Sequence, residues 1–292
     1  MKYLRTLTIC SALGFAASCW ASGAPETPKI VRFPSGDLTL GGELFLPEGE
    51  GPFPVVLFNH GSAPKMVNSM ASAAIAPNFI EKGWAFFMPY RRGQGLSEDQ
   101  GTYIMEEISD AKWFLFESAE EKLVELHKKD HLNDQMAALE WLRTQPFVDN
   151  TRIATVGNSF GGIQVMLGMG RADYCAGVNA SGAAQSWADS QELRELLRSA
   201  ATVARAPVFF FQAENDYDLS PSRELFSVME QAGKKAKIQI YPKFGSSKND
   251  GHSLPYRGVA VWFDDAIQFL DEHCEGGKLN KSMQSTANAS AD

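Results

Sequence analysis

A serine between two glycines is the clearest candidate for chemistry in this 292-residue chain. Ser159 stands in Gly157-Asn158-Ser159-Phe160-Gly161, a G-x-S-x-G pattern, with a β-prone run at 152–156 before it and an apolar run at 162–167 after it. A sharp strand-to-helix turn of this kind holds a serine hydroxyl at its tip. Glycines are needed beside it because larger side chains would collide with the neighbouring strand and helix. The pattern predicts that Ser159 is a nucleophile.

A serine hydroxyl is a weak nucleophile at neutral pH, so it needs a general base and a carboxylate that orients the base. Histidine titrates in the useful range. We expect His252 to be the base, because it follows the last predicted strand and so lies at the same end of the sheet as Ser159. Asp216, in the loop after the preceding strand, is predicted to orient His252. Asp218 is the alternative in that loop, and Glu214 is expected to support the loop.

The other four histidines are not expected to act as the base. His60 is expected to brace a loop through hydrogen bonds, and His273 to lie at the opposite rim of the sheet. His127 and His131 are four residues apart on one predicted helix, a spacing that could bind a metal. Because no third ligand is apparent, the preferred interpretation is a solvated, charged helix face. We expect neither a metal nor a cofactor.

Hydrolysis by a serine also requires donors for the oxyanion of the tetrahedral intermediate, and preorganised backbone amides serve this purpose. We expect one donor to be the backbone N–H of Phe160, at the start of the helix after Ser159. The second is expected from the loop after the apolar strand 54–59, where the Ser62 N–H is the candidate.

Gly93 and Gly95 suggest a nucleotide-binding loop, but the third glycine of that pattern is missing because Glu98 stands in its place. We interpret the segment as a tight loop near the site, with Arg91 or Arg92 as its structural anchor.

The elements that position these residues alternate along the chain. The sequence predicts strands at 29–33, 38–46, 54–59, 84–88, 152–156, 177–180, 207–212 and 236–241, and helices at 71–82, 137–143, 191–201, 222–232 and 259–273. Such alternation is typical of an α/β fold with a mostly parallel central sheet and helices on both faces.

The segment 100–130 interrupts this alternation with the aromatic residues Tyr103, Trp113, Phe114 and Phe116 and a charged helical piece at 120–129. The preferred interpretation is a helical insertion that packs its aromatics into the body of the domain. The alternative is a cap over the active site, whose aromatics line an acyl pocket.

Composition allows one large domain over residues 29–273, with 44% hydrophobic residues in the chain and no linker-like break. The net charge of −8 argues against nucleic acid or an anionic membrane as the main partner, since neither attracts a negative surface. A small-molecule ester is the expected partner. Residues 276–292 are polar and are predicted to form a disordered tail.

The N-terminus has the features of a signal peptide: Lys2 and Arg5, an apolar run at 7–17 that is too short to span a bilayer, and a cleavage site after Ala21. The alternative is a lipid anchor at Cys19. Either way we expect an exported protein, periplasmic or secreted, without a membrane span. An oxidising compartment would permit a disulfide between Cys175 and Cys274, and two separate buried thiols are the other interpretation.

The chain resembles single-domain α/β hydrolases of the dienelactone hydrolase and prolyl-oligopeptidase-like group, over roughly residues 29–273. The resemblance rests on His60-Gly61, Arg91-Arg92-Gly93-Gln94-Gly95-Leu96-Ser97, Trp141-Leu142-Arg143-Thr144-Gln145-Pro146-Phe147-Val148-Asp149, Arg152-Ile153, Gly157-Asn158-Ser159-Phe160-Gly161-Gly162, Glu214-Asn215-Asp216 and Gly251-His252.

The resemblance implies a serine hydrolase that forms an acyl-enzyme. Enzymes that hydrolyse dienelactone itself use cysteine where this chain has Ser159, which favours a carboxylesterase. Prolyl oligopeptidases carry an additional gating domain for which this length leaves no room, so a peptidase is the alternative. Acyl transfer and a non-catalytic binding protein stay open as well.

Overall fold

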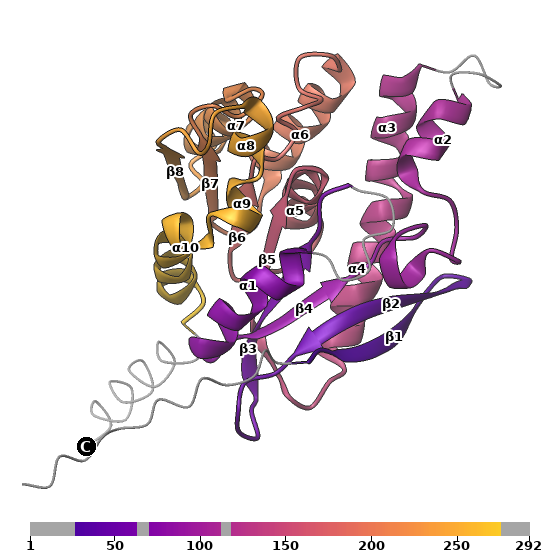
Figure 1. Ribbon diagram of the computed structural model, residues 1–292, viewed down its shortest axis with the longest axis vertical. Coiled ribbons are helices and arrows are strands. Elements are labelled where there is room, and N and C mark those ends of the chain that lie inside the picture. Colours follow the sequence, from indigo (N-terminus) through magenta and orange to yellow (C-terminus); the bar gives the residue numbers. More distant parts are fainter. Residues whose placement is uncertain (1–26, 63–69, 112–117, 276–292) are drawn as a thin grey trace, which may run out of the picture.

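The computed structural model describes residues 27–62, 70–111 and 118–275. An eight-stranded sheet crosses it in the order β1-β2-β4-β3-β5-β6-β7-β8 (Figure 1). The strands β1 and β2 are antiparallel additions at one edge, and every pairing from β4 to β8 is parallel. Their bounds are β1 Lys29–Ser35, β2 Leu38–Phe45, β3 Phe53–Asn59, β4 Ala85–Pro89, β5 Val148–Asn158, β6 Gly177–Ala180, β7 Val208–Ala213 and β8 Ala236–Tyr241. The predicted α/β-hydrolase fold is confirmed.

Helices cover both faces of the sheet, so its central strands β3, β4, β6 and β7 are apolar on both sides. In β3, Val55 and Leu57 belong to one hydrophobic core, while Val56 and Phe58 belong to the other. The first core packs under α4, α5 and α6, and the second packs under α1 and α10. The helices are α1 Met70–Glu81, α2 Ile104–Asp110, α3 Ala119–Lys128, α4 Asp130–Arg143, α5 Phe160–Arg171, α6 Gln191–Val203, α7 Ser220–Gln231, α8 Lys248–His252, α9 Leu254–Arg257 and α10 Val259–His273.

The structure has helical turns where the sequence predicts a loop before His252. The helix α8 begins after Ser247, whose hydroxyl accepts from the Asp250 N–H, while the Asp250 carboxylate accepts from the Ser247 N–H. This is a capping box with aspartate in place of glutamate, and it is the signal by which α8 could have been found. The helix α2 is a further helix that the sequence analysis did not place.

A disulfide joins Cys175, which precedes β6, to Cys274, which follows α10. It ties the end of the last helix to the sheet across a sequence separation of 99 residues. The pairing that the sequence left open is therefore present.

Several predictions fall outside the described residues: the signal segment 1–21 with Cys19, the tail 276–292, and the aromatics Trp113, Phe114 and Phe116. Within the ranges that are described, no helix combines the length and apolar character needed to cross a bilayer.

Candidate active site

Ser159 occupies a strained turn between β5 and α5. Its backbone has φ 56° and ψ −118°, values that non-glycine residues adopt rarely and mostly at functional sites. A Cβ at Gly157 would overlap the carbonyl oxygen of Gly161, and a Cβ at Gly161 would overlap that of Asn59. The predicted need for glycine at both flanking positions is confirmed. The side chain of Ser159 is partly exposed, as a reacting group must be.

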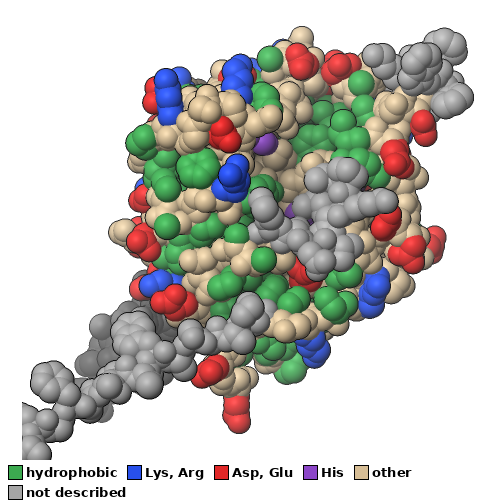
Figure 2. All heavy atoms as spheres, in the orientation of Figure 1, with side chains coloured by type: hydrophobic (Ala, Val, Ile, Leu, Met, Phe, Trp, Pro, Cys, Tyr) green, Lys and Arg blue, Asp and Glu red, His purple; other side chains and the backbone are tan. Residues whose placement is uncertain are grey.

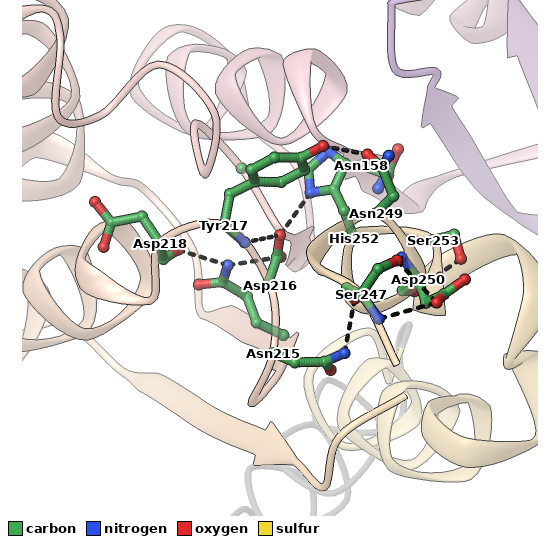
Figure 3. Close-up of polar contacts among 12 residues, drawn as sticks. Asn158, Asn215, Asp216, Tyr217, Asp218, Ser247, Asn249, Asp250, His252 and Ser253 are labelled. Atoms are coloured by element: carbon green, nitrogen blue, oxygen red, sulfur yellow. Dashed lines mark hydrogen bonds and ion pairs between the residues drawn. The ribbon is translucent and has the colours of Figure 1, made fainter. Parts of the chain in front are cut away.

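The structure brings His252 and Asp216 together. The Nδ1–H of His252 donates to Oδ1 of Asp216 over 2.8 Å, and Figure 3 shows the two side chains facing each other. The Asp216 side chain is fully buried, and that of His252 is 15% exposed. Because Nδ1 carries the proton, Nε2 is left with the lone pair that a general base uses.

Asp216 remains ionised in this buried position. Its Oδ2 accepts from Nε2 of Gln212 over 2.8 Å, and its Oδ1 accepts from the N–H of Tyr217 over 2.7 Å. Burial by itself raises the pKa of a carboxyl, but the hydrogen bonds from His252 and Gln212 outweigh that effect and hold the Asp216 pKa below its ordinary value. A negative charge is thus fixed beside the imidazole.

The two alternative acids of this loop are placed elsewhere. Oδ1 of Asp218 accepts from the N–H of Ser220 at the start of α7, over 2.8 Å, and its carboxylate points away from His252 (Figure 3). Glu214 is exposed. Asp216 is therefore the acid of this loop that contacts the imidazole.

Tyr256 joins the three segments that carry the candidate residues. It lies one helical turn after His252, donates to Oδ1 of Asn158, and accepts from the N–H of Gly61 over 3.2 Å. Burial raises the pKa of its phenol to about 12, so the hydroxyl keeps its proton. Tyr256 was not predicted, because nothing in the sequence distinguishes it from a surface tyrosine.

His252 Nε2 makes no hydrogen bond to any described residue, so the structure does not close the contact between the imidazole and the Ser159 hydroxyl. Catalytic hydrogen bonds in ligand-free enzymes are often long and shorten when substrate binds. The atom is buried and its lone pair is unused, which leaves it available to a substrate or to Ser159.

The two expected oxyanion donors lie on either side of Ser159. Phe160 is the first residue of α5, where a backbone N–H has no acceptor within the helix. The opposite loop is close, since a Cβ added at Gly61 would lie 3.5 Å from the Cβ of Ser159. The Gly61 N–H is already engaged by Tyr256, so Ser62 keeps the candidate N–H in the part of this loop that the structure describes, which ends at residue 62.

A buried arginine holds the loop that carries Ser62. Arg91 donates from Nη1 to the carbonyl of His60 over 2.7 Å and from Nη2 to the carbonyl of Gly61 over 2.8 Å. Burial lowers the Arg91 pKa to about 10, so the guanidinium remains charged at neutral pH. The Gly61 carbonyl and the Ser62 N–H belong to one peptide group, so a cation on the carbonyl makes that N–H a stronger donor. The sequence predicts Arg91 or Arg92 as the anchor of the loop around Gly93 and Gly95; Arg91 contacts Gln94 of that loop and also holds the loop that carries Ser62.

His60 is occupied on both ring nitrogens. Its Nε2 accepts from the N–H of Arg91 over 3.2 Å, which places the proton on Nδ1, 2.7 Å from the Gly61 carbonyl. Burial, followed by the charge of Arg91, holds the His60 pKa well below its ordinary value. His60 is therefore a neutral brace, as expected.

The prediction of a solvated face for His127 and His131 is wrong. They lie on two helices instead of one, His127 on α3 and His131 on α4, and both are fully buried because these helices pack against α5. Nδ1 of His127 accepts from Nε2 of Gln164 over 2.7 Å, and the His127 ring meets the Phe160 ring edge-on with centroids 5.0 Å apart. Burial and then the charge of Arg91 lower the His127 pKa to about 3. The positive charge of Arg91 would also repel a metal cation bound at this histidine. In the described ranges, no three His, Cys, Asp or Glu side chains are grouped to hold a metal.

Acid is expected to destabilise this fold through its buried histidines, His60, His127 and His131. Their folded-state pKa values lie below 6.5, chiefly because of burial, so the unfolded chain binds more protons at lower pH. Their contribution to stability is complete above the unfolded pKa near 6.5 and is lost as the pH falls, at up to about 4 kcal/mol per pH unit. Urea unfolding between pH 7.5 and pH 5.0 measures this slope.

The double variant His127→Gln/His131→Gln provides the control for this prediction. Whatever its absolute stability, its free energy of unfolding should depend on pH with about one third of the wild-type slope, since one buried histidine remains. An unchanged slope would show that other groups cause the acid sensitivity.

Comparison with known proteins agrees with the resemblance seen in the motifs. A profile of the Dienelactone hydrolase family matches residues 41–253, a stretch that includes Ser159, Asp216 and His252. The quorum-quenching protein AidA of Acinetobacter baumannii is 26% identical over 145 residues, which are 50% of this chain and 40% of AidA. The match thus spans less than half of that relative.

Solved structures share the fold at low sequence identity. The acylaminoacyl peptidase of Pyrococcus horikoshii aligns with a TM-score of 0.59 and 20% identity, over 88% of this chain and 44% of the peptidase. An esterase of Pyrococcus furiosus aligns with a TM-score of 0.60 and 12% identity, over 85% of this chain and 91% of the esterase. Est1E of Butyrivibrio proteoclasticus, solved with ferulic acid, aligns with a TM-score of 0.58 and 17% identity, over 82% of this chain and 99% of Est1E.

Proposed function

The chain belongs to the dienelactone hydrolase family, and from that premise we propose that it is a serine hydrolase that cleaves carboxylic esters through an acyl-enzyme intermediate. The observation that carries the proposal is the buried Asp216–His252 pair, with Nε2 free, at the sheet rim where Ser159 stands in its strained turn. A base oriented by a carboxylate and an exposed serine are the parts that acyl transfer requires.

In the proposed reaction, Oγ of Ser159 attacks the ester carbonyl carbon while Nε2 of His252 takes the hydroxyl proton. Asp216 stabilises the imidazolium that forms. The backbone N–H groups of Phe160 and Ser62 receive the oxyanion. The intermediate collapses, the alcohol leaves with the proton from His252, and the acyl group stays on Ser159. Water then attacks the acyl carbonyl carbon while Nε2 of His252 takes a proton from it. His252 returns the proton to Oγ of Ser159 as the acid leaves.

One observation favours esters over peptides: the chain aligns with 91% of the Pyrococcus furiosus esterase and 99% of Est1E, whereas it matches 44% of the acylaminoacyl peptidase. The proposed nucleophile is a serine, unlike the cysteine of enzymes that act on dienelactone, which argues against that lactone as the substrate. A peptidase of the prolyl-oligopeptidase-like type is the second candidate because the peptidase shares the fold, and acyl transfer to an acceptor other than water uses the same acyl-enzyme.

Two measurements test the proposal. A fluorophosphonate probe should label the protein at Ser159, and a protein that is not labelled would be a binding protein that only keeps the fold. Turnover of p-nitrophenyl esters should then exceed turnover of proline-containing peptide p-nitroanilides by at least about 100-fold in kcat/KM. Rapid amide cleavage with little ester turnover would instead support the peptidase.

We also propose export to an oxidising compartment, the periplasm or the exterior. The Cys175–Cys274 disulfide supports this, because disulfides persist in such compartments. Mass spectrometry of the mature N-terminus tests it: a chain that begins after Ala21 supports a signal peptide, a lipidated Cys19 supports an anchor, and a retained Met1 argues against export.

Arg91→Met is expected to lower kcat about 10- to 100-fold with little change in KM, because the peptide that carries the Ser62 N–H loses a charged donor at its carbonyl. Arg91→Lys should lose less, since a cation remains. Arg92→Met is the matched control from the same loop: Arg92 pairs with Asp130 and Asp134 instead of the loop carbonyls. Equal losses of kcat in Arg91→Met and Arg92→Met would contradict the proposed role of Arg91.

A further inference from the structure

A cavity of about 260 Å³ opens beside the residue that follows the nucleophile. Phe160 forms its inner wall, α2 contributes Met105 and Ile108, and α3 contributes Leu123. The turn before α6 closes the remaining side. Phe160 directly follows Ser159, and its N–H is an expected oxyanion donor, so the cavity lies beside the residue next to the proposed nucleophile.

The walls of this cavity suit an apolar group. Phe160 and Leu123 are buried, Ile108 is partly buried, and Met105 is 44% exposed, which is unusual for a large hydrophobic side chain. Figure 2 shows an apolar patch on the surface between α3 and α6, where the cavity lies. A volume of this size accepts about eight non-hydrogen atoms, so a medium-length alkyl chain or one aromatic ring would fit.

The charged groups at the cavity are carboxylates. Glu120 and Asp189 line it, and no lysine or arginine is among its described lining residues. Arg194 of α6 donates to the carbonyls of Trp187 and Ala188 in the turn beside Asp189, and Arg92 and Lys122 line a separate hollow with Glu107 and Asp110. A negative group in the cavity would therefore face two like charges on the lining itself, while the guanidinium of Arg194 is engaged by the two carbonyls.

The position of His252 decides which half of an ester lies in this cavity. His252 must protonate the alcohol oxygen as it leaves, so the alcohol is directed toward α8 and α9. Figure 1 shows α2 and α3 on the other side of α5 from α8 and α9. The acyl group, which extends from the carbonyl away from the leaving oxygen, is thereby directed toward the cavity.

We propose that this cavity is the acyl-binding pocket, and that Glu120 and Asp189 select uncharged or cationic acyl groups against those that carry a carboxylate. The proposal rests on the proposed ester hydrolysis. It makes the helices α2 and α3 part of substrate recognition.

Three p-nitrophenyl esters of equal chain length test the charge selection: hexanoate, 5-carboxypentanoate and 5-trimethylammoniopentanoate. We expect kcat/KM for the carboxylate ester to be at least about tenfold below that of the hexanoate, and that of the cationic ester to equal or exceed it. In Glu120→Gln/Asp189→Asn, kcat/KM for the carboxylate ester should rise to within about threefold of kcat/KM for the hexanoate measured on the same variant.

The variant Glu98→Gln/Glu106→Gln is the matched control, because it removes the same charge at two exposed positions that do not line the cavity. It should leave the ratio of carboxylate ester to hexanoate as in the wild type. An equal change of this ratio in both double variants would assign the effect to net charge and overturn the proposal.

Met105→Trp tests the shape of the pocket at an exposed wall, where folding is least affected. It should lower the ratio of kcat/KM for the hexanoate to kcat/KM for the acetate about tenfold. Fluorophosphonate titration counts reactive Ser159 in every variant. If Ser159 titrates fully but the enzyme does not discriminate between the acyl groups, the proposed acyl pocket is overturned and the proposed hydrolase function stands. If the wild type shows neither titration nor turnover, the proposed hydrolase function itself is overturned.

Discussion

Replacing Ser159 by alanine is expected to reduce kcat for p-nitrophenyl butyrate about 10⁴- to 10⁶-fold and to abolish labelling by a fluorophosphonate. The hydroxyl forms the covalent bond to the acyl group, so no neighbouring group substitutes for it. Binding and the oxyanion donors remain, and they account for the residual rate. Steady-state kinetics and probe labelling of purified protein measure both effects.

Ser246→Ala is the matched control for Ser159→Ala. Ser246 is exposed in the segment before α8, and its backbone N–H, which the substitution keeps, donates to the Asp250 carboxylate. Its replacement should leave kcat and labelling within twofold of the wild type. A Ser159→Ala protein that still labels and turns over would place the nucleophile elsewhere and remove the basis of the proposed function.

Asp216→Asn is expected to lower kcat by about 10⁴ with little change in KM. An asparagine amide in contact with Nδ1 favours the imidazole tautomer with its proton on Nε2, so the lone pair needed to accept the Ser159 proton is lost. Because hydrogen bonds from His252 and Gln212 overcome the effect of burial and keep the Asp216 pKa below its ordinary value, the wild-type rate should not fall through this group above about pH 5.

Asp218→Asn separates the orienting acid from its neighbour two residues away. Asp218 accepts from the Ser220 N–H at the start of α7, a task that asparagine performs about as well. We expect a loss of kcat of less than threefold and a thermal midpoint within about 2 °C of the wild type. A collapse of kcat in this variant, together with only a few-fold loss in Asp216→Asn, would show that the acids were assigned in the wrong order.

Local features made much of the fold readable from the sequence. The continuous apolar run of β3 predicted a strand covered on both faces, and Val55, Val56, Leu57 and Phe58 do alternate between two cores. The glycines around Ser159 predicted a turn too tight for side chains, because that restriction acts between atoms a few residues apart. The capping box at Ser247 and Asp250 was equally local, and it would have predicted α8 had it been used.

The sequence by itself determined the α/β sheet, the strained Ser159 turn and the sheet end at which acid and base stand, because hydrophobic periodicity and turn sterics are encoded in neighbouring residues. Tertiary structure decided the rest. It placed Asp216 instead of Asp218 against His252, buried His127 and His131 under Phe160, and set Arg91 and Tyr256 around the Gly61 loop. These contacts join residues up to 195 positions apart, and which side chains meet at such separations depends on the path of loops and the packing of helix faces.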